Sequence, residues 1–394
     1  MISVAAAKEK IINNVVPLTP VKSMLHLAAG KVLAEDVYSA TDIPSFNQSS
    51  MDGYAFSFDD WKTNQSLKIN GEIAAGDNVV TYISPGSAVR IFTGAAVPPG
   101  ADTVVMQEKI KIENGHLIIS DETMVKGLNV RLKGFEIKAG ELAMKNNSLL
   151  TPAAIGFLAG VGITEIAAYP YPSVSIIVTG NELQVPGNTL QAGQLYESNS
   201  FSLSAALKLM HFTEVKIYKV EDSLEKITEV LNNSLQKSDV VFLTGGISVG
   251  DYDFVLQAAT ACGVEKLFHK VKQRPGRPLY AGKKENKLIF GLPGNPASVL
   301  TCFYEYAEPA LKKMILQKTS VQIKNALLAE PFKKAAGLTH FLKGYYDGSI
   351  VTALNAQESY RLSSFAQANC LIKIDEATIA CEKGELVEIH LLPF

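Results

Sequence analysis

The chain contains few cysteines and histidines, and none of them stands in a pattern typical of disulfides or metal sites. It has four cysteines and six histidines. The cysteines, at positions 262, 302, 370 and 381, are far apart and form no CxxC pair, and the histidines have no HxxxH or HxxEH spacing. Neither a disulfide framework nor a zinc site is therefore expected.

The sequence also lacks a block of positive charge and a long apolar run. Its 37 basic and 39 acidic residues give a formal net charge of −2, so broad binding to nucleic acid is not expected. The most apolar run, residues 153–168, is interrupted by glycines, Thr164 and Glu165 and is too short to span a bilayer. Because the start of the chain has no charged region followed by an apolar one, we expect no signal peptide, no membrane partner and a cytoplasmic location.

Changes in the residue pattern along the 394 residues predict several domains. Two helical patterns lie in residues 4–29, and Thr151 followed by Pro152 marks the start of a third. Between them, short β-prone runs alternate with turns rich in Gly, Pro and Asn. This order predicts a discontinuous helical linker domain, residues 1–41 and 137–169, that carries an inserted β-barrel-like domain, residues 42–136.

From residue 172 onward, apolar runs typical of strands alternate with helical patterns. Strands are expected near residues 174–178, 215–220, 240–243 and 288–290, and helices near 201–209, 224–231, 255–261 and 299–315. The alternation predicts an α/β domain with a parallel-rich sheet over residues 170–318, and a C-terminal β domain follows over residues 319–394. The expected fold class is therefore multidomain α/β.

The most informative stretch is D-V-V-F-L-T-G-G-I-S-V-G-D-Y-D, residues 239–253. Glycines after a buried strand let backbone N–H groups approach an anion closely. Carboxylates beside an anion would repel it unless a divalent cation lies between them, so we expect a phosphorylated ligand held with Mg²⁺. The alternative is an ordinary strand–helix turn. The residues concerned are Gly245, Gly246, Gly250, Asp251 and Asp253.

Polar residues also follow the other predicted strands. Ligands of open α/β sheets lie at the carboxyl ends of the strands, so we expect these loops to form one pocket. Each has a structural alternative: Asp222 could cap a helix in a capping box with Glu225, Glu182 could form a surface ion pair, and the prolines could stiffen a turn. The loops hold Thr179, Gly180, Asn181 and Glu182, then Glu221 and Asp222, then Pro293, Gly294, Asn295 and Pro296.

Basic residues gather in the run H-K-V-K-Q-R-P-G-R-P, residues 269–278. Two prolines stiffen this run, which would preorganise its cations for a polyanion. A solvated loop would explain the charges equally well. The cations are Lys270, Lys272, Arg274 and Arg277.

Two clusters in residues 42–56 and 92–108 mix polar and aromatic side chains that would suit a flat heterocycle, although hairpin turns explain their spacing better. Together with the loops above, they resemble the molybdopterin molybdenumtransferase family, the MoeA proteins, to which the E domain of gephyrin also belongs. The matching motifs lie in order over nearly the whole chain. They are S-S-M-D-G-Y-A at 49–55, F-T-G-A with P-x-G-A-D at 92–102, T-G-N-E-L at 179–183, G-G-I-S-V-G-D-Y-D at 245–253, R-P-G-R-P at 274–278, G-L-P-G-N-P at 291–296 and L-S-S-F-A-Q-A-N at 362–369.

The resemblance implies a four-domain subunit whose α/β domain binds molybdopterin. It implies a reaction in which adenylated molybdopterin and molybdate give AMP and the molybdenum cofactor, with Mg²⁺. In that reaction the glycine-loop N–H groups and Ser248 would hold the phosphates, and Glu182, Asp222 and Asp253 would organise Mg²⁺. The cations Lys270, Arg274 and Arg277 would neutralise the anhydride and attract molybdate.

The family analogy also implies a homodimer with an intersubunit active site. Asp52 and Thr93 would reach the site from the partner subunit, and Lys343 and Ser363 of the C-terminal domain would lie near molybdate. Molybdopterin adenylyltransferase and molybdoenzyme-maturation proteins are the expected protein partners. The sequence departs from the family pattern at several positions, among them Glu136, which stands where the family more often has Asp.

Two other functions stay open. A molybdopterin adenylyltransferase shares the α/β fold of residues 170–318, but it would need neither the β insertion nor the C-terminal domain. A non-catalytic scaffold of the gephyrin E type is the other, although the catalytic-looking residues are intact.

Overall fold

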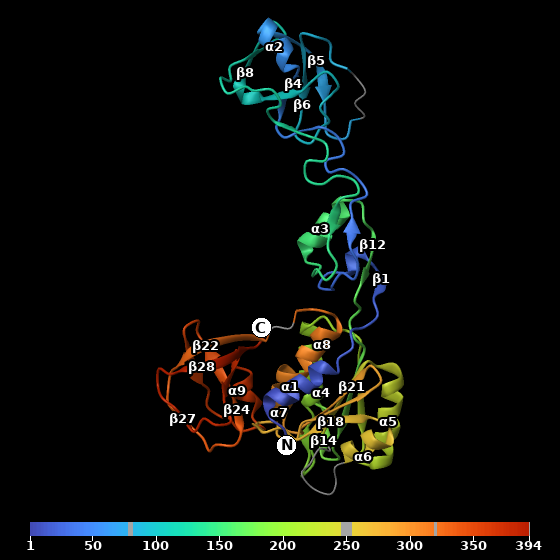
Figure 1. Cartoon of the computed structure of the whole chain (residues 1–394), viewed down its shortest axis with the longest axis vertical. Coiled ribbons are helices and arrows are strands. Elements are labelled where there is room, and N and C mark those ends of the chain that lie inside the picture. Colours follow the sequence, from blue (N-terminus) through green and yellow to red (C-terminus); the bar gives the residue numbers. More distant parts are fainter. Residues whose placement is uncertain (78–81, 246–253, 319–320, 394) are drawn as a thin grey trace. The chain divides into compact units, whose positions relative to one another are not determined.

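The computed structural model describes residues 1–77, 82–245, 254–318 and 321–393. The chain divides into two compact units, one formed by residues 1–21 and 169–394 and the other by residues 22–168 (Figure 1). Helix α1 (Val4–Asn13) belongs to the larger unit, because Val4, Ala7 and Ile11 are buried in its core. The sequence instead predicts that this helix shares a domain with residues 137–169. In the described parts of the chain, no helix is both long and apolar enough to cross a membrane.

A six-stranded sheet lies at the centre of the α/β fold, in the order β16-β13-β17-β21-β20-β18. Strands β16, β13, β17 and β21 are parallel, and β20 and β18 are antiparallel. The predicted parallel-rich sheet is therefore confirmed, and the antiparallel edge adds to it. The strands are β13 (Val174–Thr179), β16 (Val215–Val220), β17 (Val240–Thr244), β18 (Glu265–His269), β20 (Tyr280–Lys284) and β21 (Lys287–Leu292).

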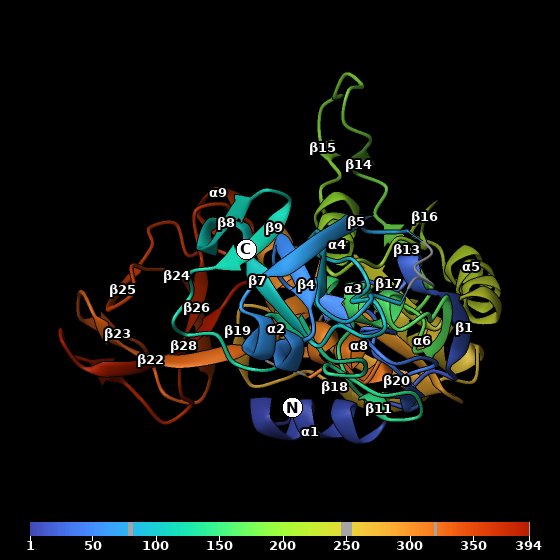
Figure 2. The same ribbon diagram turned by 90° about the horizontal axis from the view of Figure 1, so that it is seen from above.

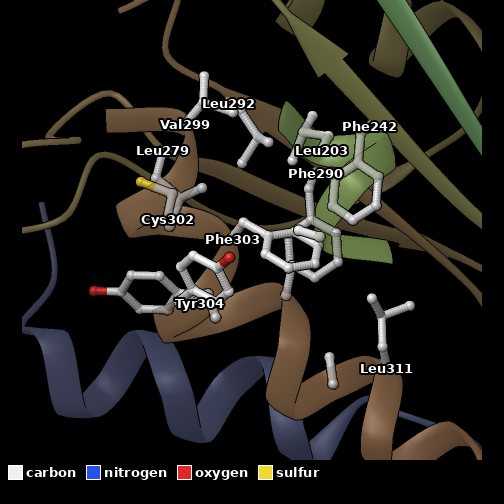
Figure 3. Packing of buried hydrophobic residues seen from close by; sticks show 14 of the residues in the cluster. Leu203, Phe242, Leu279, Phe290, Leu292, Val299, Cys302, Phe303, Tyr304 and Leu311 are labelled. Atoms are coloured by element: carbon white, nitrogen blue, oxygen red, sulfur yellow. The ribbon is translucent and has the colours of Figure 1, made fainter. Parts of the chain in front are cut away.

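Helices cover both faces of this sheet because its central strands are apolar on both sides. Phe242 and Phe290 point to the face covered by α1, α4, α7, η3 and α8, where Figure 3 shows them beside Phe303. Val241 and Ile289 point to the face covered by α5 and α6. These elements are α4 (Asn199–Leu209), α5 (Leu224–Lys237), α6 (Phe254–Ala261), α7 (Pro296–Cys302), the π-helical turn η3 (Phe303–Ala307) and α8 (Glu308–Met314).

The C-terminal domain is a second six-stranded sheet, in the order β19-β24-β25-β22-β28-β26. Its edge strand β19 (Gln273–Arg274) comes from the basic run of the α/β domain, so the two domains share backbone hydrogen bonds. The other elements are β22 (Gln322–Leu328), β23 (Phe332–Lys333), β24 (Thr339–Tyr346), β25 (Ile350–Ala353), α9 (Leu362–Phe365), β26 (Cys370–Ile374), β27 (Ala380–Cys381) and β28 (Leu386–Leu391). Figure 2 shows the loop with β14 (Leu183–Gln184) and β15 (Leu195–Tyr196) extending away from the α/β sheet.

The smaller unit contains the inserted β fold, a six-stranded sheet in the order β7-β4-β6-β5-β9-β8 with apolar clusters on both faces. Most of the predicted strands are present, and helix α2 (Phe58–Asn64) was not predicted. The elements are β3 (Gln48–Ser49), β4 (Gly53–Phe56), β5 (Leu67–Ile73), β6 (Ser87–Ile91), β7 (Thr103–Met106), η2 (Gln107–Lys109), β8 (Ile110–Glu113), β9 (His116–Ile119) and β10 (Val130–Arg131).

The rest of the smaller unit forms its own apolar cluster around α3 (Pro152–Gly160). As predicted, Thr151 caps this helix, since its hydroxyl accepts a hydrogen bond from Ala154 N at 3.2 Å. The second predicted helix of residues 4–29 is wrong: its apolar residues form a strand that pairs with β12 and a short 3-10 turn. The elements are β1 (Val21–Met24), η1 (Leu25–Leu27), β2 (Val37–Tyr38), β11 (Leu142–Met144) and β12 (Glu165–Ala168).

Truncation of Phe242 tests the packing of the α/β core. Its ring centroid lies 5.5 Å from that of Phe290 and 6.0 Å from that of Phe303. We expect Phe242→Ala to lower the free energy of unfolding by about 3–5 kcal/mol, because it removes buried contacts and leaves a cavity. The control is Ile217→Ala on edge strand β16, where the side chain is 52% exposed. Urea denaturation measures the free energy of unfolding of both variants. Equal losses in the two would contradict this account of the core packing.

Candidate functional site

Four polar atoms near the carboxyl edge of the α/β sheet are buried and have no hydrogen-bond partner among the described residues. They are Thr179 Oγ1, Asn199 Oδ1, Asp222 Oδ1 and Thr244 Oγ1. Thr179 ends β13, Thr244 ends β17, Asp222 follows β16, and Asn199 begins α4. Since a buried polar atom without a partner costs about 1–3 kcal/mol, such a group is typical of a ligand site. We call these four residues, with Gly245 and residues 293–296, the strand-end cluster.

Glycine at position 245 lets two of the loops approach each other closely. Gly245 has a φ of +86°, and a Cβ atom there would lie 2.2 Å from the backbone oxygen of Thr179. A Cβ atom on Gly294 would lie 3.9 Å from Gly245 Cα, so the turn after β21 adjoins the same place. The structure therefore brings together the ends of β13, β17 and β21, as the sequence predicted.

Asp222 is not a helix cap, so the predicted capping box with Glu225 is wrong. Helix α5 has Ser223 at its N-cap position, and no side chain makes a capping hydrogen bond there. Instead, Asp222 N donates a hydrogen bond to Asn181 Oδ1 at 3.2 Å. Burial raises the pKa of Asp222 above its ordinary value, and the negative charge of Glu182 raises that pKa further. A cation between these two carboxylates would offset both effects.

Several predicted site residues fall outside the described residues. They are Gly246, Ser248, Gly250, Asp251 and Asp253. Within the described ranges, no three His, Cys, Asp or Glu side chains are grouped as a metal site. Of the three predicted Mg²⁺ ligands, Glu182 and Asp222 lie within the described residues. The third, Asp253, stays a prediction.

Asn199 is a site residue that sequence reasoning missed. Its side-chain amide donates a hydrogen bond to Gly294 O at 2.9 Å, and its own side-chain oxygen is one of the unpaired atoms. The residue is only 6% exposed. In the sequence it looks like an ordinary polar residue at a helix start, so its burial gives the only signal of a site role.

The basic run is braced from inside by Gln273. Its side-chain amide donates to Pro275 O at 2.9 Å, and Tyr306 donates its hydroxyl proton to the Gln273 side chain. This brace leaves Arg274 and Arg277 exposed to solvent. Lys272 is instead paired with Glu376 at 2.7 Å, and Lys270 adopts a left-handed backbone with a φ of +70°.

Arg274 lines a pocket of about 560 Å³ together with Lys333, Lys334 and residues 356–358 of the C-terminal domain. His340 also lines this pocket, and burial with the charges of Lys334 and Arg274 lowers its pKa to about 4. The imidazole is therefore neutral at pH 7. The positive charge of this basic pocket comes from Arg274 and the two lysines, which outnumber the one carboxylate in its lining, that of Glu358, so the pocket suits an anion.

The two other residues predicted to lie near molybdate differ in their exposure to solvent. Ser363 lies on α9 and is exposed, whereas Lys343 on β24 is 3% exposed. Lys343 Nζ donates to the backbone oxygens of Ala356, Glu358 and Arg361 at 2.6, 3.2 and 3.0 Å. All three ammonium protons are thus used within the protein.

In the smaller unit, Asp52 and Thr93 lie together although they come from separate motifs. Thr93 donates both its backbone N–H and its hydroxyl to Asp52 Oδ1, at 2.7 and 2.8 Å. These bonds lower the pKa of Asp52, and the charge of Arg90 lowers it further. Arg90 is held against the rings of Tyr54 and Phe92, with its guanidinium carbon 5.3 Å from each centroid. The pair thus presents a fixed, ionised carboxylate at the surface.

Sequence profiles of known protein families match three regions of the chain. "MoeA N-terminal region (domain I and II)" matches residues 2–162, "Probable molybdopterin binding domain" matches residues 175–313, and "MoeA C-terminal region (domain IV)" matches residues 325–392. Every part of the candidate site lies in a matched region.

Relatives and solved structures match over the full length. A molybdopterin molybdenumtransferase from Haemophilus influenzae is 32% identical over 405 residues and covers 100% of both chains. One from Staphylococcus aureus strain Mu50 is 33% identical over 402 residues, which is 99% of this chain and 95% of that relative. Two crystal structures of MoeA proteins from Pyrococcus horikoshii have TM-scores of 0.85 and 0.80 at 28% and 27% identity, and cover 99% and 100% of both chains.

The raised pKa of Asp222 predicts a pH-dependent stability. A proton binds this carboxyl more tightly in the folded than in the unfolded chain, so the ionised form opposes folding at neutral pH. We expect Asp222→Asn to raise the melting temperature at pH 7 in metal-free buffer. The gain should disappear as the pH falls below the ordinary Asp value of 3.8. The control is Glu221→Gln, an exposed residue paired with Lys226 at 2.6 Å. A destabilised Asp222→Asn at pH 7 would contradict the assignment.

Proposed function

Because the chain belongs to the molybdopterin molybdenumtransferase family, we propose that it inserts molybdate into adenylated molybdopterin and releases AMP in a Mg²⁺-dependent reaction that yields the molybdenum cofactor. The observation that carries the proposal is the strand-end cluster. Thr179, Asp222 and Thr244 each have a buried polar atom with no partner among the described residues, at a place where Gly245 allows close backbone approach. A phosphorylated ligand offers acceptors for the hydroxyls, and a cation offers a partner for the carboxylate.

The strand-end cluster fits the phosphate groups of the pterin substrate. The hydroxyls of Thr179 and Thr244 can donate to phosphate oxygens. Asn199 can offer a donor on the ligand its side-chain oxygen, which has no partner within the described ranges. The turn at residues 293–296 leads into helix α7, whose first residue is Pro296. The glycine-loop residues Gly246, Ser248 and Gly250 would add further donors.

The carboxylates fit a Mg²⁺ ion. Glu182 and Asp222 would hold it, with Asp253 as the third ligand, because oxygen atoms of carboxylates are the protein groups that Mg²⁺ prefers. When bound, the ion would neutralise charge that develops on the anhydride oxygens. Its presence would also remove the repulsion that raises the pKa of Asp222.

The basic pocket fits the molybdate dianion. Arg274, Lys333 and Lys334 supply positive charge at its wall, and His340 stays neutral. Arg277 and Lys270 belong to the same basic run as Arg274 and would attract the anhydride. Water cleaves the anhydride bond between the pterin phosphate and AMP, and AMP leaves. Bonds between molybdenum and the two dithiolene sulfurs form as molybdate oxygens depart as water with the thiol protons.

The proposal includes a homodimer in which the Asp52–Thr93 pair acts in the partner subunit's site. A surface carboxylate that is held by two hydrogen bonds and kept ionised is suited to such a contribution. We further propose a cytoplasmic location, which agrees with four free, buried cysteines. Molybdopterin adenylyltransferase is the expected supplier of the substrate, and molybdoenzyme-maturation proteins are the expected recipients of the product.

The alternatives are less well supported. An adenylyltransferase would leave the matched regions at residues 2–162 and 325–392 without a purpose. A non-catalytic scaffold would have no reason to keep buried polar atoms that lack partners among the described residues beside a glycine with a positive φ.

Release of AMP tests the proposed reaction. We expect AMP from adenylated molybdopterin only when Mg²⁺ and molybdate are both present, and we expect Arg274→Ala to raise the KM for molybdate by roughly tenfold through the loss of one positive contact. The control is Lys324→Ala, an exposed lysine on β22 that does not line the basic pocket. AMP release at an unchanged rate without molybdate would refute the coupling.

Mixed dimers test the shared site. We expect Asp52→Ala and Asp222→Ala to be inactive as separate homodimers, and a mixture containing heterodimers to regain activity at one of its two sites. Differently tagged subunits allow the heterodimer to be purified and assayed. Inactive heterodimers of the two variants would place Asp52 and Asp222 in the same subunit's site and would contradict the shared site.

A further inference from the structure

The loop between β25 and α9, residues 354–361, touches the turn of the strand-end cluster. Asn295 donates its side-chain amide to Ser359 Oγ at 2.8 Å. Ala297 N, in the first turn of α7, donates to Ser359 O at 3.0 Å. The C-terminal domain therefore holds the G-N-P turn of the α/β domain directly, through a side chain and a backbone group of one residue.

The buried side chain of Lys343 fixes this loop through hydrogen bonds. Its ammonium group donates to three carbonyl oxygens of the loop, those of Ala356, Glu358 and Arg361. A buried ammonium group is tolerated only when its donors are satisfied, and here the three acceptors match its three protons. Burial lowers the pKa of Lys343, and the nearby carboxylate of Glu358 opposes that effect.

The side chains of Gln357 and Ser364 also fix the loop through hydrogen bonds. The Gln357 side chain donates to Lys343 O at 2.9 Å and to Leu354 O at 2.7 Å, and it accepts from Lys343 N at 3.0 Å. Ser364 Oγ donates to Ala356 O at 2.8 Å. An irregular loop is thus fixed by side chains from β24 and α9, in place of a backbone ladder.

The same loop also forms part of the basic pocket. Ala356, Gln357 and Glu358 line that pocket together with Arg274. One short segment therefore contacts the turn that we assign to the pterin substrate and the pocket that we assign to molybdate. The position of residues 354–361 therefore determines where the turn lies relative to the basic pocket.

We propose that Lys343 is a positioning residue that holds residues 354–361 as a strap between the phosphate turn and the basic pocket. This role rests on the proposed function for its catalytic consequence. It differs from direct contact between Lys343 and molybdate, because the three protons of the ammonium group already have acceptors. Loss of the ammonium frees the strap, and through Ser359 it loosens the turn at Asn295 and Ala297.

Hydrogen exchange tests the link without relying on activity. We expect Lys343→Met to speed amide exchange by at least about tenfold in residues 354–361 and also in residues 294–298, because the charged donor of three hydrogen bonds is lost. Lys343→Arg, which keeps a cationic donor, should restore much of the protection. The control is Lys373→Met, a half-buried lysine of the same domain that pairs with Asp375 and Glu388.

Exchange that rises in residues 354–361 but stays at the wild-type rate in residues 294–298 would overturn the proposal. Exchange that stays at the wild-type rate in both segments would overturn it too. If Lys343→Met does not fold, Ser359→Ala tests the same link, since it removes only the hydroxyl that accepts from Asn295. Its exchange in residues 294–298 should rise, and an unchanged rate would again count against the strap.

Kinetics separate positioning from direct contact. Positioning predicts that Lys343→Met raises the KM for adenylated molybdopterin, and that the effects of Lys343→Met and Ser359→Ala on this KM are not additive, because both act through one contact. Direct contact predicts a rise in the KM for molybdate alone, which would overturn the proposal. A wild-type protein that releases no AMP would refute the proposed function, whereas the exchange result would still decide whether Lys343 positions the turn.

Discussion

The parallel register of β13, β16, β17 and β21 is the constraint on which the rest of the site depends. Because Thr179 pairs with Val220, and Thr244 pairs with Leu292, the loops after these four strands leave the sheet at one edge. The register is set by apolar residues that face helices on both sides of the sheet, so the site's geometry follows from the core. Loops that are far apart in the sequence meet only because these strands run in the same direction.

The candidate site is energetically unfavourable as far as the described residues show. The hydroxyls of Thr179 and Thr244 have no hydrogen-bond partner among those residues, which costs roughly 1–3 kcal/mol each, and burial opposes the ionised form of Asp222. Apolar residues could fill the same space at lower cost, yet they would offer nothing to a phosphate or a cation. In the proposed function, this loss of local stability is exchanged for affinity, while the buried ammonium of Lys343 and the brace at Gln273 keep the surrounding loops in place.

The sequence predicted the α/β domain and most of the candidate site, because strand periodicity and the polar residues that follow each strand are local signals. It failed where tertiary contacts decide. Asp222 precedes a helical pattern with Glu225 three residues later, yet the helix has Ser223 at its N-cap position. Asn199 shows its importance through its burial and through a side-chain oxygen without a partner among the described residues. Residues 21–24 have a helical pattern but pair with β12 as a strand. Lys343 was expected near an anion, and only coordinates reveal its three carbonyl partners.

The central claim is that the strand-end cluster binds a divalent cation together with a phosphate group. Anomalous diffraction from crystals soaked with Mn²⁺ and AMP tests it most directly, since Mn²⁺ replaces Mg²⁺ at oxygen sites. The account predicts an anomalous peak coordinated by the Asp222 carboxylate, with AMP phosphate density beside Thr179 and Thr244. A manganese peak bound elsewhere, with the Asp222 carboxylate uncoordinated in the presence of bound AMP, would contradict it.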